Sequence, residues 1–191
     1  FTLKPRKTKE GSRIGTLEMT EPPDAMERAV PSAGIEEWLL EDAAVRARRE
    51  HGQLREALAD LYGQACLVRA GAEPNRLNLE LRKLRELVKQ FRAQWIAHIQ
   101  WEEQELFPYS ARYFGEDPDL FAYMEQESEL ADQYLQAFLH ALDRSVIPIA
   151  ADEAKRMVSY LMQAYAFLKN RFGEEEEILT ALTERSNGLD D

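Results

Sequence analysis

Apolar residues recur at steps of three and four positions along most of the chain, which is the spacing of one face of an α-helix. These stripes predict helices over residues 35–68, 75–108 and 151–183, and another that begins at Pro118 and stops before Pro148. No segment alternates apolar and polar residues over a useful length, so the pattern predicts no β-strand. Four amphipathic helices with short connections are typical of an up-down-up-down four-helix bundle, and the predicted fold class is all-α.

Glycine, proline and short polar residues mark the predicted connections between these helices. The turn from Gly71 to Pro74 ends the first helix, and residues 109–117 are predicted to form a loop after the second. Asp117 followed by Pro118 suits the start of the next helix. An aspartate there accepts a hydrogen bond from a free backbone N–H, and a first-turn proline lacks the N–H that the helix does not use.

The first 34 residues have no helical period and contain four prolines. Residues 1–13 carry five basic side chains against one acid, Glu10, whereas the whole chain has a formal charge of −11. The predicted organisation is therefore an extended basic arm over 1–34, a helical bundle over 35–185 and a short tail over 186–191. The arm is expected to dock on its own acidic bundle or on a protein partner, a second copy of this chain included.

Charge, hydropathy and cysteine content argue against several classes of protein. The acidic net charge argues against a nucleic-acid partner, because nucleic-acid backbones are polyanions. No apolar run approaches the roughly 20 residues that span a bilayer, so no membrane partner is expected. The single cysteine, Cys66, cannot form an internal disulfide. This suits a reducing compartment and predicts a cytoplasmic protein.

The second predicted helix ends in a pair of residues that carry candidate chemistry. His98 and Glu102 are four positions apart, so their side chains lie on one helical face and can close on one cation. The apolar stripe through Val88, Phe91 and Trp95 runs directly into this pair, so both residues are predicted to be buried. A buried carboxylate must be ligated, paired or protonated, because an unpaired buried charge costs several kcal/mol.

The string His98-x-x-x-Glu102-Glu103-x-x-Leu106-Phe107-Pro108 resembles the second-helix motif of hemerythrin-like proteins, the HHE cation-binding family. Members of that family are four-helix bundles that hold a non-haem di-iron centre between their helices. His51, in Glu50-His51-x-x-Leu54, matches the first-helix histidine, and Glu175 matches a carboxylate of the fourth helix. The resemblance covers about residues 35–185. It implies that His51, His98, Glu102 and Glu175 are metal ligands and that iron is the metal.

The chain departs from the family pattern on two helices. Arg171 stands where the fourth-helix motif has histidine, and the third helix offers Glu127-Ser128 or Glu125-Gln126 where the family has a glutamate followed by a histidine. Glu127 is therefore a fifth candidate ligand, and the set suits one iron or none better than two. A guanidinium is always charged and hydrogen-bonds carboxylates bidentately, so Arg171 is predicted to replace a metal cation.

Two functions from different classes follow from this pattern. The first is a hemerythrin-like cation-binding protein with an incomplete site, which binds or senses O₂, NO or redox state without turnover and is therefore not an enzyme. The second is a metal-free pseudo-hemerythrin that acts as a regulatory protein–protein interaction module. The string Arg171-Phe172-x-x-Glu175-Glu176 resembles the last helix of the regulator-of-sigma-D family, small metal-free bundles that bind a sigma factor.

Overall fold

The computed structural model describes residues 32–71, 74–114 and 118–187. All regular structure in this part of the chain is helical, which confirms the predicted all-α class. The helices are α1 (Ser32–Ala70), α2 (Pro74–Trp101), the π-helical turn η1 (Glu102–Leu106), α3 (Phe107–Phe114), α4 (Pro118–Arg144) and α5 (Ala151–Asn187). Within the described ranges, no helix is long and apolar enough to cross a membrane.

The described ranges bear on several of the predicted boundaries. Residues 1–31 and 188–191, and with them most of the predicted arm and tail, lie outside the described residues, as does the predicted N-cap Asp117. The first helix begins at Ser32 and the last ends at Asn187, so each extends slightly beyond its predicted range. The helix predicted from Pro118 begins at that residue.

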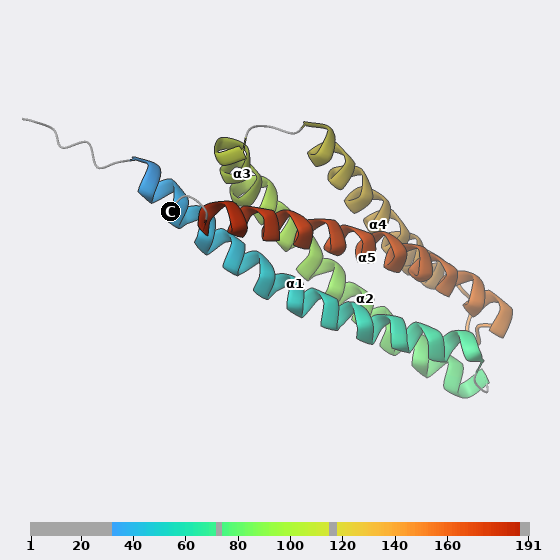
Figure 1. Ribbon diagram of the computed structural model, residues 1–191. Coiled ribbons are helices and arrows are strands. Elements are labelled where there is room, and N and C mark those ends of the chain that lie inside the picture. Colours follow the sequence, from blue (N-terminus) through green and yellow to red (C-terminus); the bar gives the residue numbers. More distant parts are fainter. Residues whose placement is uncertain (1–31, 72–73, 115–117, 188–191) are drawn as a thin grey trace, which may run out of the picture. The chain divides into compact units, whose positions relative to one another are not determined.

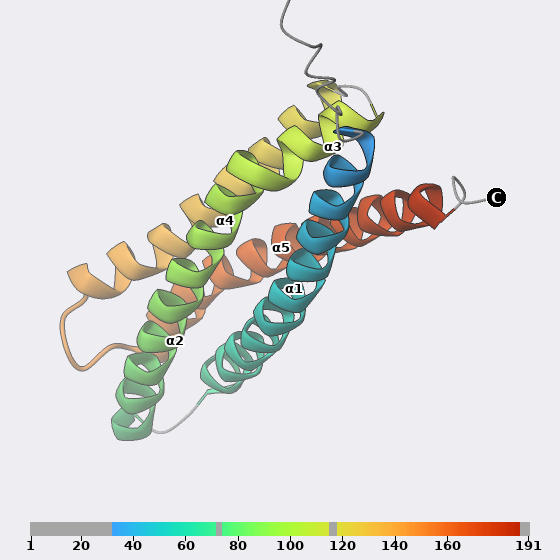
Figure 2. The same ribbon diagram turned by 90° about the vertical axis from the view of Figure 1, so that its left-hand side faces the viewer.

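The four long helices form the predicted up-down-up-down bundle (Figure 1). In chain order α1, α2, α4 and α5 run alternately up and down, with α1 packed against both α2 and α5, and α4 packed against α5 (Figure 2). The first helix ends at Ala70 and is followed by Gly71, whose φ of 86° lies in the left-handed region that glycine adopts without strain. This glycine ends α1 where the chain turns back toward α2.

The bundle core is a continuous layer of leucine and aromatic side chains that the helical stripes turn inward. Its largest fully buried members come from all four long helices: Leu61, Leu77, Leu81, Leu84, Phe91, Trp95, Leu135, Phe138, Leu161 and Phe172. Their burial supplies the main stabilisation of the bundle, at roughly 25 cal/mol for each Å² of apolar surface removed from water.

Arginine side chains tie neighbouring helices together at the edges of this core. Arg92 on α2 contacts Asp132 on α4 through two nitrogens, at 2.5 and 3.0 Å. On the opposite side, Arg55 of α1 donates to the backbone oxygen of Phe172 on α5 at 2.6 Å. Arg48 donates to the backbone oxygen of Leu179 at 3.1 Å. These contacts fix how far the helices are shifted along one another.

The predicted end of the second helix at Pro108 is wrong. Helical structure continues from α2 through η1 and α3 to Phe114, so the segment 109–114 is helix rather than loop. A proline inside an α-helix clashes with the carbonyl four residues earlier and lacks the N–H that would bond to it. The wider π turn just before Pro108, in which the Phe107 N–H donates to the Glu102 oxygen, offers room for the ring without ending the helix.

Truncating a core leucine tests this packing. Leu135→Ala on α4, where the side chain is fully buried, should lower the free energy of unfolding by roughly 2–5 kcal/mol, because it removes apolar contacts and leaves a cavity. The matched variant Leu67→Ala on α1, where the side chain is 61% exposed, should change it by less than about 0.5 kcal/mol. Urea unfolding followed by circular dichroism measures both. Equal losses in the two variants would contradict the core assignment.

Candidate metal centre

Four buried side chains from different helices meet at one end of the bundle. His51 comes from α1, His98 from α2, Glu102 from the first position of η1, and Glu175 from α5. One ligand atom from each lies within 4.8 Å of all the others. The structure thus brings together four of the five predicted ligands, and among the described residues no other such group occurs.

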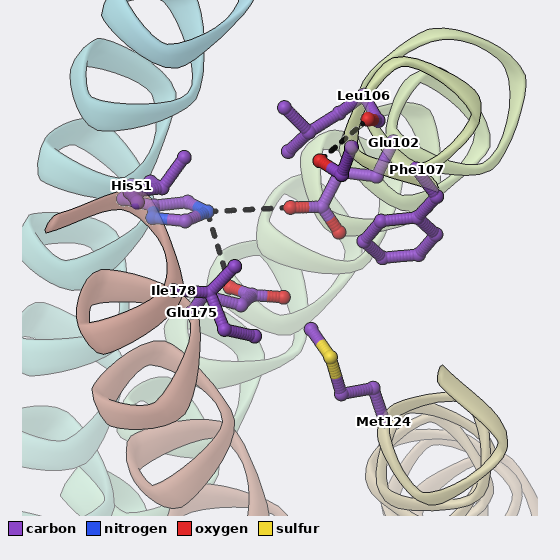
Figure 3. Close-up of a pocket in the computed structure, with 9 residues that line it drawn as sticks. His51, Glu102, Leu106, Phe107, Met124, Glu175 and Ile178 are labelled. Carbon is purple, nitrogen blue, oxygen red and sulfur yellow. Dashed lines mark hydrogen bonds and ion pairs between the residues drawn. The ribbon is translucent and has the colours of Figure 1, made fainter. Parts of the chain in front are cut away.

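The four ligand atoms point at one another. The two imidazole Nε2 atoms are 2.9 Å apart, and His98 Nε2 lies 3.0 Å from Glu102 Oε1. His51 Nε2 lies 3.1 Å from Glu175 Oε2 and 3.5 Å from Glu102 Oε1. Figure 3 shows these two carboxylates reaching toward His51 from opposite helices. Two nitrogens and two oxygens, the atoms through which these side chains bind metals, therefore converge on one small region.

The size and chemistry of this region fit one metal ion. Ligand atoms about 2.1 Å from a metal lie about 3.0 Å apart in octahedral geometry and about 3.4 Å apart in tetrahedral geometry. Four of the six distances among the ligand atoms, at 2.9–3.5 Å, bracket these values, and all six are within 4.8 Å. Glu102 Oε1 and Glu175 Oε2 are buried and contact the imidazoles, so a metal ion bound there would take the place of an imidazole proton as their partner. Two imidazoles and two carboxylates suit iron, zinc and manganese.

Arg171 occupies the other side of the two carboxylates. Its Nη2 lies 2.9 Å from Glu102 Oε2, and its Nε lies 2.7 Å from Glu175 Oε1, while the residue is only 1% exposed. Each carboxylate thus gives one oxygen to the imidazoles and the other to the guanidinium. A permanent positive charge stands on one side of the carboxylates, and the candidate metal position stands on the other.

The two carboxyl groups respond differently to this setting. Burial acts to raise the pKa of Glu102, but hydrogen bonds from both imidazoles and the charge of Arg171 outweigh it and hold that pKa below its usual range. The pKa of Glu175 is raised, because burial and the negative charge of Glu102 outweigh the attraction of His51 and Arg171. Glu102 is therefore the more firmly ionised of the pair.

The imidazoles are biased toward their protonated forms. Burial acts to lower the pKa of His51, but the contacts with Glu102 and Glu175 prevail and raise it to about 9. The pKa of His98 is also raised, since Glu102 and Glu50 outweigh burial and the neighbouring charge of His51. Without a metal, a proton thus takes part in balancing the buried carboxylates.

Glu50 is a contributor that spacing alone did not single out. Its Oε2 lies 2.9 Å from His98 Nδ1, on the side of the ring that faces away from the other ligands. Arg46 Nε donates to its Oε1 at 2.8 Å, and together these contacts hold the pKa of Glu50 low against the opposing effect of burial. The residue is adjacent to His51 in sequence, but 48 positions separate it from His98, so only tertiary packing reveals the contact.

Glu127, the fifth predicted ligand, lies outside this group. It is buried on α4, where its Oε1 accepts hydrogen bonds from Asn170 at 2.8 Å and from the Tyr123 hydroxyl at 3.1 Å. The third histidine, His140, is exposed on the same helix. The third long helix thus contributes no donor to the four-residue group.

A small cavity adjoins the group on the side of the carboxylates. Its volume of about 10 Å³ is close to the minimum that holds one water molecule. Figure 3 shows Phe107, Met124 and Ile178 closing around it. Besides His51, Glu102 and Glu175, the lining consists of Leu106, Phe107, Ser110, Met124, Ile178 and Leu179. Only a very small ligand has room beside the carboxylates.

A comparison with protein-family models identifies the family. The model for the hemerythrin HHE cation binding domain matches residues 43–182, which include all four grouped residues and Arg171. The match covers well over half of the chain, and the chain therefore belongs to this family. Searches of curated proteins and of solved structures gave no match.

The raised pKa of His51 predicts a pH-dependent stability of the metal-free protein. The pKa of His51 rises from 6.5 to about 9 on folding. The stabilisation that protonated His51 gives to the folded state is therefore complete below about pH 6.5 and is lost as the pH rises through 9. At about 1.4 kcal/mol per pKa unit, the free energy of unfolding should fall by roughly 3 kcal/mol over this interval. Urea unfolding in the presence of a chelator measures the change.

Two variants test whether His51 causes this pH dependence. His51→Gln should flatten this pH dependence, whereas His140→Gln, at an exposed position, should leave it unchanged. A slope that persists undiminished in His51→Gln would contradict the assignment.

Proposed function

We propose that this member of the hemerythrin HHE cation-binding family holds one divalent transition-metal ion among His51, His98, Glu102 and Glu175. The observation that carries the proposal is the division of both carboxylates, each with one oxygen toward the imidazoles and the other toward Arg171. Such a division leaves one cation position open on the imidazole side and fills the other with a guanidinium.

Arg171 favours one ion over two. A second ion on the far side of the carboxylates would stand beside a guanidinium that is 1% exposed and always charged. At an effective dielectric constant near 20, a divalent ion about 4 Å from a unit positive charge is repelled by roughly 8 kcal/mol. The third long helix also supplies no histidine, so a second ion would lack donors there.

We propose iron as the metal, with a binding or sensing role for O₂, NO or redox state rather than turnover. Bound iron would supply one-electron redox chemistry and an affinity for small ligands. The cavity of about 10 Å³ beside the carboxylates supports a role without turnover of an organic substrate, because its volume is close to that needed by one water molecule.

Aromatic residues around the four donors hold them in place and exclude water. The Phe172 ring lies 5.5 Å from that of His51 and 5.4 Å from that of Trp95, and Trp95 in turn lies 6.1 Å from His98. These buried rings form an apolar wall between the four donors and the rest of the core. In such surroundings electrostatic contacts are stronger than in water.

A metal-free function has one observation in its favour. Arg171 balances one carboxylate, and a proton held by the imidazoles balances the other, so the cluster needs no metal to be neutral. In that case the chain would be a pseudo-hemerythrin that regulates a protein partner by contact, with the basic residues 1–13 as the docking segment. Metal content decides between the two functions.

Elemental analysis with an absorption spectrum on the same sample tests the proposed function. We expect close to one iron per chain after reconstitution with Fe²⁺. His98→Ala should abolish binding, because it removes a donor at the centre of the group, whereas His140→Ala should bind like the unmodified protein. Absence of metal with or without added Fe²⁺, in a folded chain that a chelator does not destabilise, would refute the proposal and support the interaction module.

Substitution of Arg171 tests its role as the second cation. Arg171→His removes a fixed charge and adds an imidazole between Glu102 and Glu175, so the bound iron should rise from one toward two per chain. Arg171→Gln removes the charge without adding an imidazole, so the bound iron should stay near one per chain. Unchanged stoichiometry in a folded Arg171→His variant would show that the guanidinium does not hold the place of a cation.

A further inference from the structure

We propose that Glu50 is a positioning residue, which keeps the Nε2 lone pair of His98 directed at the metal by accepting a hydrogen bond from Nδ1–H. This inference rests on the proposed function, since it assigns His98 as a ligand. It adds a residue outside the four donors and explains how one of them is held in the form that binds metal.

The contacts of His98 Nε2 offer acceptors for a proton on that nitrogen. Nε2 lies 3.0 Å from Glu102 Oε1 and 2.9 Å from His51 Nε2, and either atom can accept a proton from it. A neutral imidazole carries one N–H, and its position depends on which nitrogen finds the better acceptor. With the proton on Nε2, His98 would donate into the group and could not bind a metal.

Glu50 supplies the competing acceptor on the other edge of the ring. Its Oε2 lies 2.9 Å from His98 Nδ1, and an ionised carboxylate is a stronger acceptor than a neutral group. A hydrogen bond there places the proton on Nδ1 and leaves Nε2 free. Carboxylates that hold the far nitrogen of a ligating histidine commonly fix its tautomer and its orientation in metal sites.

Glu50 is itself held in place from the surface. Arg46 Nε donates to its second oxygen at 2.8 Å, and the Arg46 guanidinium stacks 4.2 Å from the Trp101 ring centroid. The Trp101 indole N–H donates to Glu105 at 2.8 Å. Arg46, Trp101 and Glu105 thus fix the position of Glu50, whose side chain is 22% exposed and stands between solvent and the buried histidine.

The two histidines differ in this support. His51 Nδ1 is buried and has no hydrogen-bond partner, whereas His98 Nδ1 has Glu50. Only His98 is therefore held by a carboxylate on its far side. Loss of Glu50 should remove the carboxylate that fixes the His98 tautomer, and not merely weaken a surface ion pair.

The experiment reads the tautomer directly and the metal affinity separately. In the metal-free protein at alkaline pH, where both imidazoles are neutral, ¹⁵N chemical shifts should show His98 as the Nδ1–H tautomer. Glu50→Ala should shift it toward Nε2–H, and Glu50→Gln, which keeps a weaker acceptor, should fall between. Titration with Co²⁺ as the probe should show an affinity lowered about 10- to 100-fold in Glu50→Ala.

Glu80→Gln on α2 is the matched control. Glu80 is partly buried and lies four residues after an arginine, as Glu50 does, with 3.9 Å between Arg76 and the carboxylate. It hydrogen-bonds Gln64 and Lys83 rather than a histidine, so its replacement should change neither the His98 tautomer nor the Co²⁺ affinity.

The outcomes separate the two proposals. A wild-type chain that fails to bind Co²⁺ would overturn the proposed function, and the role of Glu50 with it. Binding by the wild type, together with an unchanged His98 tautomer and unchanged affinity in folded Glu50→Ala, would overturn only the positioning role. A shifted tautomer with weakened binding in Glu50→Ala, and neither effect in Glu80→Gln, would support it.

Discussion

The end of the bundle that holds Glu102 and Glu175 depends on one constraint: two carboxylates are buried side by side and must be met by positive charge. Neither residue is more than 3% exposed, and the negative charge of one raises the pKa of the other. Arg171 meets one oxygen of each carboxylate, and the imidazoles meet the remaining two. Removal of any one cationic partner would leave a buried anion uncompensated, and such losses cost far more than a surface ion pair is worth. At this end of the bundle, charge pairing between helices therefore adds to the apolar packing that holds them together.

The sequence was most informative where one helix alone sets the geometry. The apolar stripes, the pairing of His98 with Glu102 and the pairing of Arg171 with Glu175 all follow from a spacing of three or four residues, and the structure has each of them. Contacts between helices could not be predicted from the sequence. Glu127 was predicted as a ligand from its place in the family motif, but in the packing of α4 on α5 it contacts Asn170 and not the four donors. The contact of Glu50 with His98 likewise depends on how α1 and α2 are shifted along one another, which no local pattern encodes.

The π turn at Glu102–Leu106 explains both the error at Pro108 and the shape of the cavity. Proline predicts the end of an α-helix because an α-helix needs the carbonyl four residues back, and the π turn relaxes that need. The same turn changes which residues share a face. The residue four positions after Glu102 is Leu106 and the residue five positions after it is Phe107, and both line the cavity beside the carboxylate. A regular α-helix would rotate the second of these farther away from Glu102. One wide turn thus accommodates a proline and lines one side of a cavity of about 10 Å³.

The charge balance of the cluster bears on how a metal would be gained and lost. In many structural metal sites the ligands repel one another without the ion, so the fold depends on it. Here the guanidinium of Arg171 is a permanent counter-charge, and the pKa of His51, raised to about 9, lets a proton occupy the region where the lone pairs converge. A metal and a proton would therefore compete for the same nitrogens, and after loss of the ion a proton would take its place beside the carboxylates. Counted with Arg171 and the two carboxylates, the site would be neutral with one proton and would carry one positive charge with a divalent ion, so neither state would leave a buried anion uncompensated. That property suits the proposed binding or sensing role better than a structural one, and it follows from replacing one histidine of the family motif by arginine.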